Sequence, residues 1–120
     1  MQLEPISITE IIFRSHLKTL YKKGKLPVKY GIYGEILTPK NVSDEHIICK
    51  CHGGSNKLSN IALAAVELNV KRGCKPIEDF VTFGMLRQYL RQFRGVRRQG
   101  FDGDSYIRGI RKTFKDIVDG

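Results

Sequence analysis

Residues 44–73 read DEHIICKCHGGSNKLSNIALAAVELNVKRG, and this stretch decides how the chain is interpreted. Its first part is rich in β-branched residues, and we expect a short strand over 45–50. A loop follows over 51–57, because Gly-Gly-Ser-Asn sustains neither regular element. A helix capped by Ser59 or Asn60 is then predicted to fold back over the strand.

Four polar side chains are expected to meet where this helix covers the strand. Glu45 and His46 lie on the strand, Asn60 opens the helix, and Asn69 lies near its predicted end at Gly73. An acidic oxygen and an amide oxygen can hold a hard divalent cation beside a free imidazole. Such a site can hydrolyse a phosphodiester, with the metal on the phosphate and the histidine activating water.

The cysteines suggest a different metal site, which the spacing disfavours. Cys49, Cys51 and His52 with the distant Cys74 would supply three sulfurs and one nitrogen. Structural zinc sites usually offer two separated pairs of cysteines, whereas this chain has one C-x-C pair without a partner pair. Neighbouring residues on a strand also point to opposite faces. Small buried cysteines are the commoner explanation, so we expect no structural zinc.

Several segments of this stretch together resemble the HNH endonuclease motif, which has the ββα-metal fold. The resemblance covers about residues 30–80 and agrees in both residue type and spacing. The matching segments are Glu45-His46-Ile47-Ile48, Gly53-Gly54-Ser55-Asn56, Leu58-Ser59-Asn60-Ile61 and Asn69-Val70-Lys71-Arg72-Gly73.

This resemblance implies a role for each matched polar residue. It assigns the catalytic positions to His46, as general base, and to Asn60, which orients the loop and the histidine. It makes Glu45 and Asn69 the ligands of one divalent cation, with Mg²⁺ as first choice and Mn²⁺ or another transition metal as the alternative. The implied activity is hydrolysis of DNA phosphodiester bonds, by nicking if the protein is a monomer.

One departure from the family pattern keeps a second interpretation open. The family usually has Asp where Glu45 stands, and the extra methylene shifts the carboxylate. The alternative function is therefore a weak or inactive HNH-fold module that binds nucleic acid or protein. A basic component of a larger nucleoprotein assembly is a third possibility.

The charge is concentrated on one part of the chain. The net charge is +9, and residues 71–98 hold eight Lys/Arg against two Asp/Glu. Such a basic concentration points to a polyanion, most often nucleic acid, although a basic surface that serves solubility is the plain alternative. The predicted DNA contacts are Lys71, Arg72, Arg87, Arg91, Arg94 and Arg98. The four last-named arginines follow helical spacing beside an apolar face.

Patterns outside the motif complete the predicted architecture. We expect a helix over 8–23, a hairpin over 28–37, a helix opening at Pro76 and a last helix capped by Asp104. The predicted fold class is α+β and mostly helical, with a ββα-metal element inserted between an N-terminal helix and two C-terminal helices. One domain is expected over 1–120, with an HNH core at about 30–80 and a basic helical extension at about 76–120.

The expected partners and location follow from the same features. The chain has no apolar run of membrane-spanning length and no secretory leader, so no membrane partner is expected. Three cysteines do not form a disulfide framework, which favours a reducing intracellular setting. DNA is the expected partner, with RNA left open, as are a homodimer and a larger phage or nucleoprotein assembly. If a phage or mobile element encodes the chain, that setting is the cytoplasm of a bacterial host.

Overall fold

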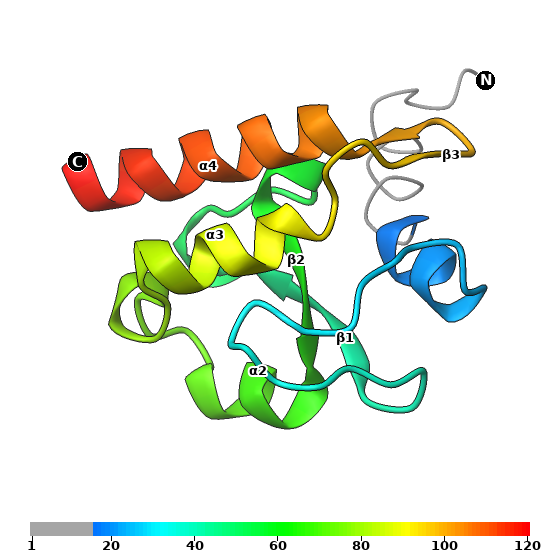
Figure 1. Cartoon of the computed structure of the whole chain (residues 1–120). Helices are drawn as coiled ribbons and strands as arrows, with labels where there is room; N and C mark the ends of the chain where they lie inside the picture. The colour runs from blue at the N-terminus through cyan, green and yellow to red at the C-terminus, as the bar shows by residue number, and fades with distance from the viewer. Residues whose placement is uncertain (1–15) are drawn as a thin grey trace, which may run out of the picture.

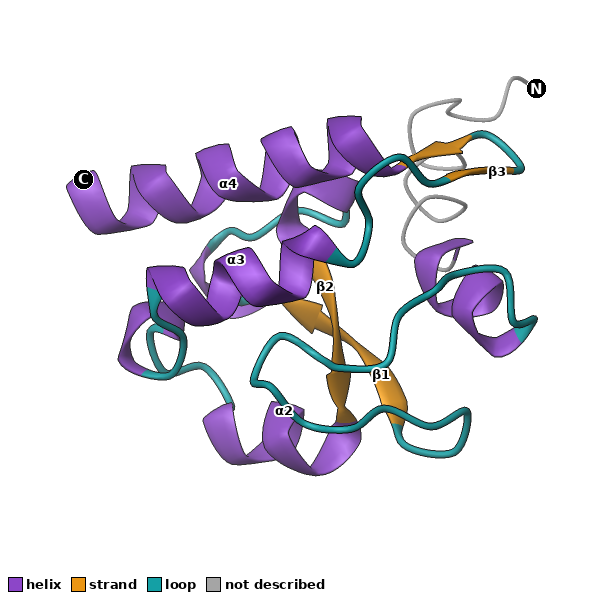
Figure 2. Ribbon diagram, in the orientation of Figure 1, coloured by secondary structure: helices purple, strands orange, loops and turns teal. Residues whose placement is uncertain are grey.

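The computed structural model of the protein describes residues 16–120. Residues 16–22 are helical, and the part of the predicted N-terminal helix before residue 16 lies outside the described residues. The mixture of helices and short antiparallel strands confirms the predicted α+β class (Figure 1 and Figure 2). The later elements are β1 (Val42–His46), β2 (Ile61–Ala65), α2 (Val66–Arg72), α3 (Phe83–Arg91), β3 (Arg97–Arg98), β4 (Phe101–Asp102) and α4 (Gly103–Asp119).

Strands β1 and β2 form an antiparallel pair, and β2 occupies the place where a helix was predicted. Val42 pairs with Ala65 and His46 pairs with Ile61. The helix predicted from Asn60 is therefore wrong in its first half, since only Val66–Arg72 is helical. All five residues of β2 are buried, and periodicity cannot distinguish a continuous apolar run of this kind from a buried helix. Pairing with β1 overrides the helix propensity of its alanines.

The edge of β2 that faces away from β1 is bonded to the rest of the molecule. Four consecutive backbone groups along this edge have partners outside the β1–β2 pair. The Tyr89 hydroxyl accepts a hydrogen bond from Leu63 N–H and is also hydrogen-bonded to the Tyr106 hydroxyl. The Tyr106 hydroxyl donates to the Ile61 carbonyl. This chain of hydroxyls ties α3 and α4 to β2. The four bonds are Tyr106 Oη to Ile61 O (2.7 Å), Leu63 N to Tyr89 Oη (2.8 Å), Ile32 N to Leu63 O (3.0 Å) and Ala65 N to Glu35 Oε2 (2.7 Å).

The segment over 28–37 forms a tight turn rather than the predicted strand hairpin. Its only β pairing is an isolated bridge between Tyr30 and Ile36. The Glu35 carboxylate holds the turn, because it accepts from Tyr33 N–H at 3.0 Å and from Ala65 N–H. A side chain at Gly31 would lie 2.6 Å from that carboxylate, so the turn closes tightly around it.

Helices α3 and α4 run in opposite directions beside the β1–β2 pair (Figure 1). A 3₁₀ turn over Ile77–Asp79 replaces the helix start predicted at Pro76, and α3 begins instead after Thr82. The Thr82 hydroxyl caps α3 by accepting from Met85 N–H. Asp102, rather than the predicted Asp104, caps α4 by accepting from two backbone N–H groups. Both sequence positions carry a good capping residue, and the β3–β4 hairpin fixes which one is used.

Aromatic rings from α3, β4 and α4 fill the core beneath this helix pair. Phe93 packs edge-on against Tyr89, with ring centroids 5.1 Å apart, and against Tyr106 at 4.8 Å. These contacts hold the two helices on the same side of β2. Among residues 16–120, none of the helices combines the length and apolar character needed to cross a lipid bilayer.

Candidate functional site

The order β1, loop, β2, α2 brings the predicted site residues into one region. Glu45 and His46 end β1, Asn60 directly precedes β2, and Asn69 and Arg72 lie on α2. Their side chains do not converge on one point, however. Glu45 and Arg72 bind each other, whereas the side chains of His46, Asn60 and Asn69 each bind other parts of the chain.

Glu45 is buried and fully engaged by two protein groups. Its side chain is 3% exposed, and Arg72 Nη1 lies 3.1 Å from its Oε1. The Tyr33 hydroxyl donates to Oε2 at 2.5 Å. Burial raises the pKa of the Glu45 carboxyl, while the Tyr33 hydrogen bond and the Arg72 charge oppose that rise. The predicted metal ligand is thus half of an internal ion pair, because the longer Glu side chain reaches across to α2.

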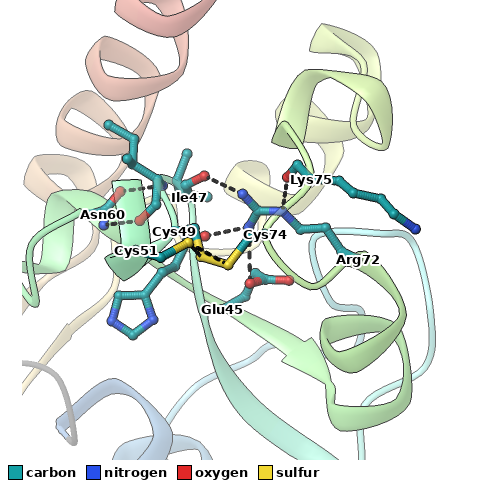
Figure 3. Close-up of a disulfide and its surroundings, with 10 residues drawn as sticks. Glu45, Ile47, Cys49, Cys51, Asn60, Arg72, Cys74 and Lys75 are labelled. Atoms are coloured by element: carbon teal, nitrogen blue, oxygen red, sulfur yellow. Dashed lines mark hydrogen bonds and ion pairs between the residues drawn. A yellow bond between two sulfur atoms is a disulfide. The ribbon is translucent and has the colours of Figure 1, made fainter. Parts of the chain in front are cut away.

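Arg72 was predicted as a DNA contact, but it lies inside the protein. Only 2% of the residue is exposed. Besides the ion pair with Glu45, its guanidinium donates to the carbonyl oxygens of His46, Ile47 and Lys75 (Figure 3). It therefore links the end of β1 to the chain that follows α2, and it cannot reach a surface ligand.

His46 and Asn60 both act on the loop between the strands. His46 Nε2 lies 2.9 Å from Asn56 Oδ1. Since an amide oxygen only accepts, Nε2 is the donor in this contact, and Nδ1 is the ring nitrogen that faces away from it. The buried Asn60 side chain accepts from Ile48 N–H at 2.8 Å and donates to the carbonyls of Ile48 and Ser55. These bonds close the loop over 48–55.

Asn69 contacts β1 through the nitrogen of its side-chain amide. This nitrogen donates to Ser43 Oγ at 3.1 Å and to the Asp44 carbonyl at 2.9 Å. Asn69 therefore holds α2 against the strand, as Arg72 does three residues later at the end of the helix. Lys71, the other predicted contact on this helix, is exposed.

The predicted cofactor was one divalent cation such as Mg²⁺, bound by Glu45 and Asn69, with no structural zinc. The arrangement of the side chains contradicts this prediction, because the candidate metal ligands that come together are cysteines. Among the described residues, one group of potential metal-binding side chains (His, Cys, Asp or Glu) lies close enough together to hold an ion. It consists of Cys49, Cys51 and Cys74. All three sulfurs lie within 4.8 Å of one another. Cysteine sulfur suits zinc and other soft ions, whereas Mg²⁺ prefers oxygen ligands.

The cysteine cluster was considered in the sequence but rejected as a metal site, and the strand predicted over 45–50 does not extend as far as expected. Strand β1 ends at His46, and Lys50–His52 forms a 3₁₀ helix instead. Both Cys49 and Cys51 face Cys74, which lies just beyond the end of α2 (Figure 3). The sequence analysis considered Cys74, 25 residues after Cys49, together with the C-x-C pair, but disfavoured the set because a second pair of cysteines was absent.

Two members of the predicted arginine stripe, Arg87 and Arg91, lie on α3, and Arg94 lies in the turn that follows this helix. Arg87, Arg91 and Arg94 are exposed and line a cavity of about 510 Å³. Arg98 belongs to β3 and lies outside this cavity lining, because α3 ends at Arg91 and the helical spacing stops there.

Helix α4 supplies a second row of cations to the same cavity, which we call the α3–α4 groove. Sequence reasoning missed Arg108, Arg111 and Lys115, although they repeat at helical spacing opposite the buried face of α4. The lining also contains one carboxylate, Asp104, whose Oδ2 pairs with Arg97 at 3.2 Å. The apolar part of the lining is Phe83, Leu86, Leu90 and Ile107.

Comparison of the chain with protein-family models, with curated proteins and with solved structures finds no match.

Proposed function

We propose that this protein binds single-stranded nucleic acid in the α3–α4 groove. The observation that carries the proposal is the pair of cationic rows on two antiparallel helices. Six Lys and Arg side chains line the groove against the single carboxylate of Asp104, which is already paired with Arg97. A bound polyanion would neutralise these charges and release its counterions.

The extent of the two rows favours a polymer over a single small anion. On α4, Arg108 and Lys115 are seven positions apart, and on the other side of the groove Arg87 and Arg91 of α3 are followed by Arg94 in the turn after the helix. Seven helical residues span about 10 Å, which is more than one phosphate group occupies. Successive phosphates of one strand can therefore contact successive cations along each helix.

The apolar lining favours a single strand with accessible bases. Phe83 is 49% exposed at the groove, and its ring is held by an edge contact with Phe114 at 5.1 Å. Proteins that bind single strands combine a basic groove with aromatic rings on which bases stack. In a duplex the bases are already stacked, so Phe83 would have no equivalent partner.

Binding is tested by fluorescence anisotropy with labelled single-stranded and duplex oligonucleotides of unrelated sequences. The wild type should prefer the single strand, and affinity should fall with salt at a slope of about 0.7 per phosphate contacted. Replacing Arg87, Arg91 and Arg111 by Ala should weaken binding to all sequences and reduce that slope by about two.

A matched control removes the same charge elsewhere. Lys22, Lys23 and Lys40 are exposed and do not line the groove. Their triple Ala variant should keep most of the affinity. Equal losses in the two triple variants would mean that net charge alone attracts the oligonucleotide, and the groove assignment would fail.

Hydrolysis of the bound strand stays a separate prediction. The Nδ1 nitrogen of His46 faces away from the contact with Asn56, but the carboxylate that the HNH resemblance gives to the metal is bound to Arg72 and Tyr33. Binding is therefore the function that the geometry supports best. Plasmid incubated with wild type and with His46→Ala separates the two: cleavage lost only in the variant would establish an enzyme, whereas intact plasmid in both supports a binding module.

A further inference from the structure

The three cysteines of the cluster come from two separate parts of the chain. Cys49 and Cys51 lie at the start of the loop after β1, and Cys74 follows the last residue of α2 by two positions (Figure 3). Cys49 and Cys74 form a disulfide, with Cα atoms 5.5 Å apart. Cys51 Sγ lies 3.0 Å from Cys49 Sγ and 2.6 Å from Cys74 Sγ.

The disulfide accounts for two of these sulfurs but not for the position of the third. Cys51 is an exposed residue on a short 3₁₀ helix, and its thiol could point to solvent. Instead it contacts both other sulfurs. Three sulfurs directed at one point are the arrangement found around tetrahedral zinc, where Zn–S bonds of about 2.3 Å place the sulfurs about 3.8 Å apart.

We propose that the reduced protein binds one Zn²⁺ ion, or a similar soft divalent cation, through the thiolates of Cys49, Cys51 and Cys74. The fourth position of the tetrahedron is left to solvent or a small ligand. The role is structural, because the ion would join the loop after β1 to the end of α2. This inference is independent of the nucleic-acid groove, which lies on α3 and α4.

The surrounding contacts already hold the two ligand segments together. The Arg72 guanidinium donates to the carbonyls of His46 and Ile47 on one side and Lys75 on the other. The Cys49 carbonyl accepts from His52 N–H at 2.8 Å and Gly54 N–H at 3.1 Å, which fixes the turn that carries Cys51. Little chain ordering therefore remains to be done when the ion binds.

The local charge also favours three thiolates. Lys50 lies between the two loop cysteines and Lys75 directly follows Cys74, and both are exposed. Their positive charges offset the negative charge that three thiolates leave around one Zn²⁺.

The site becomes available through a balanced reduction. A phosphine reductant breaks the Cys49–Cys74 bond: phosphorus gives two electrons and takes the oxygen of one water, whose two protons pass to the sulfurs. The products are two thiols and one phosphine oxide. Zn²⁺ then displaces three protons from the three thiols.

The test compares zinc uptake by reduced wild type, Cys51→Ser and His52→Ala, measured by native mass spectrometry and by competition with a chromophoric chelator. Wild type should bind one ion per chain. Cys51→Ser keeps the Cys49–Cys74 pair, so it can fold in its oxidised form. After reduction it should bind Zn²⁺ at least about 100-fold more weakly than wild type. Loss of a residue that only supports a metal ligand costs up to about 100-fold in metal affinity, and loss of a ligand should cost at least as much.

His52→Ala is the matched control, because His52 belongs to the same 3₁₀ helix but not to the cluster. It should bind like wild type. Added Zn²⁺ should raise the thermal midpoint of the reduced wild type and of His52→Ala, but not that of Cys51→Ser. Reduced wild type that takes up no zinc, or equal binding by Cys51→Ser and wild type, would overturn the proposal.

Discussion

Glu45 and Arg72 face each other inside the protein, with Oε1 and Nη1 3.1 Å apart and 3% of each side chain exposed. The pair joins β1 to α2 and takes both residues away from the roles that the sequence suggested for them. An isolated buried charge would be costly, so each side chain depends on the other. The first prediction concerns this dependence.

Glu45→Gln should change how stability depends on pH. Burial raises the pKa of the Glu45 carboxyl above its usual 4.5. The carboxyl therefore binds a proton more tightly in the folded state than in the unfolded state. As pH falls through the folded pKa toward 4.5, proton binding by Glu45 increases the free energy of unfolding. Gln cannot titrate, so wild type should gain stability relative to the variant between about pH 7 and pH 5. Urea unfolding at both pH values measures this, and a constant difference would contradict it.

Asn60→Ala should destabilise the loop between the strands. It removes one acceptor and two donated bonds, and it leaves the partly buried Ile48 N–H without its side-chain partner. The expected loss is about 2–4 kcal/mol, somewhat more than one unsatisfied buried group costs. Urea unfolding gives the free energy. Asn41→Ala, on an exposed turn, should cost less and serves as the control; equal losses would contradict the role of Asn60.

Two glycines should respond oppositely to a methyl group. A Cβ at Gly54 would lie 1.7 Å from the Ile48 carbonyl oxygen, so Gly54→Ala must displace the loop and should lower the free energy of unfolding by several kcal/mol. At Gly84, in α3, the nearest atom to such a Cβ is Thr82 Oγ1 at 3.7 Å. Gly84→Ala should therefore stabilise by about 0.5–1 kcal/mol through helix propensity. Thermal unfolding of both variants checks the two signs.

Phe83→Ala should weaken binding of a single strand but not of a polyanion that has no bases. Base stacking on an aromatic ring contributes about 1–3 kcal/mol, so affinity should fall about 5- to 100-fold. Phe83→Tyr keeps the ring and should bind like wild type. Inorganic polyphosphate, used as competitor, should bind the wild type and both variants with the same affinity. An unchanged oligonucleotide affinity in Phe83→Ala would mean that no base reaches the ring.

The sequence predicted best what depends on local spacing. The arginines of this region repeat beside an apolar face: Arg87 and Arg91 are exposed on α3, and Arg94, in the turn after it, lines the same cavity. Asn60 was singled out through the HNH resemblance and as the cap of a predicted helix, whereas it precedes strand β2 and bonds the loop over 48–55. The arginine spacing needed only neighbours within about two helical turns.

The predictions that failed depended on contacts between distant residues. Ile61–Ala65 is a strand because β1 and two tyrosine hydroxyls satisfy its backbone, and no pattern within five apolar residues reveals that. Glu45 looked like a metal ligand until Arg72, 27 positions later, was found to pair with it. The cysteines likewise come together only after β1 ends and the chain turns back toward α2.

The bonded outer edge of β2 has a consequence for self-association. An open strand edge is a template on which another chain can add a strand, and this is the usual route to aggregates and fibres. From the Ile61 carbonyl to the Ala65 N–H, each outward backbone group is already taken, two of them by tyrosine hydroxyls from helices that cover the edge. A second copy of the folded protein therefore cannot extend the sheet at the outer edge of β2.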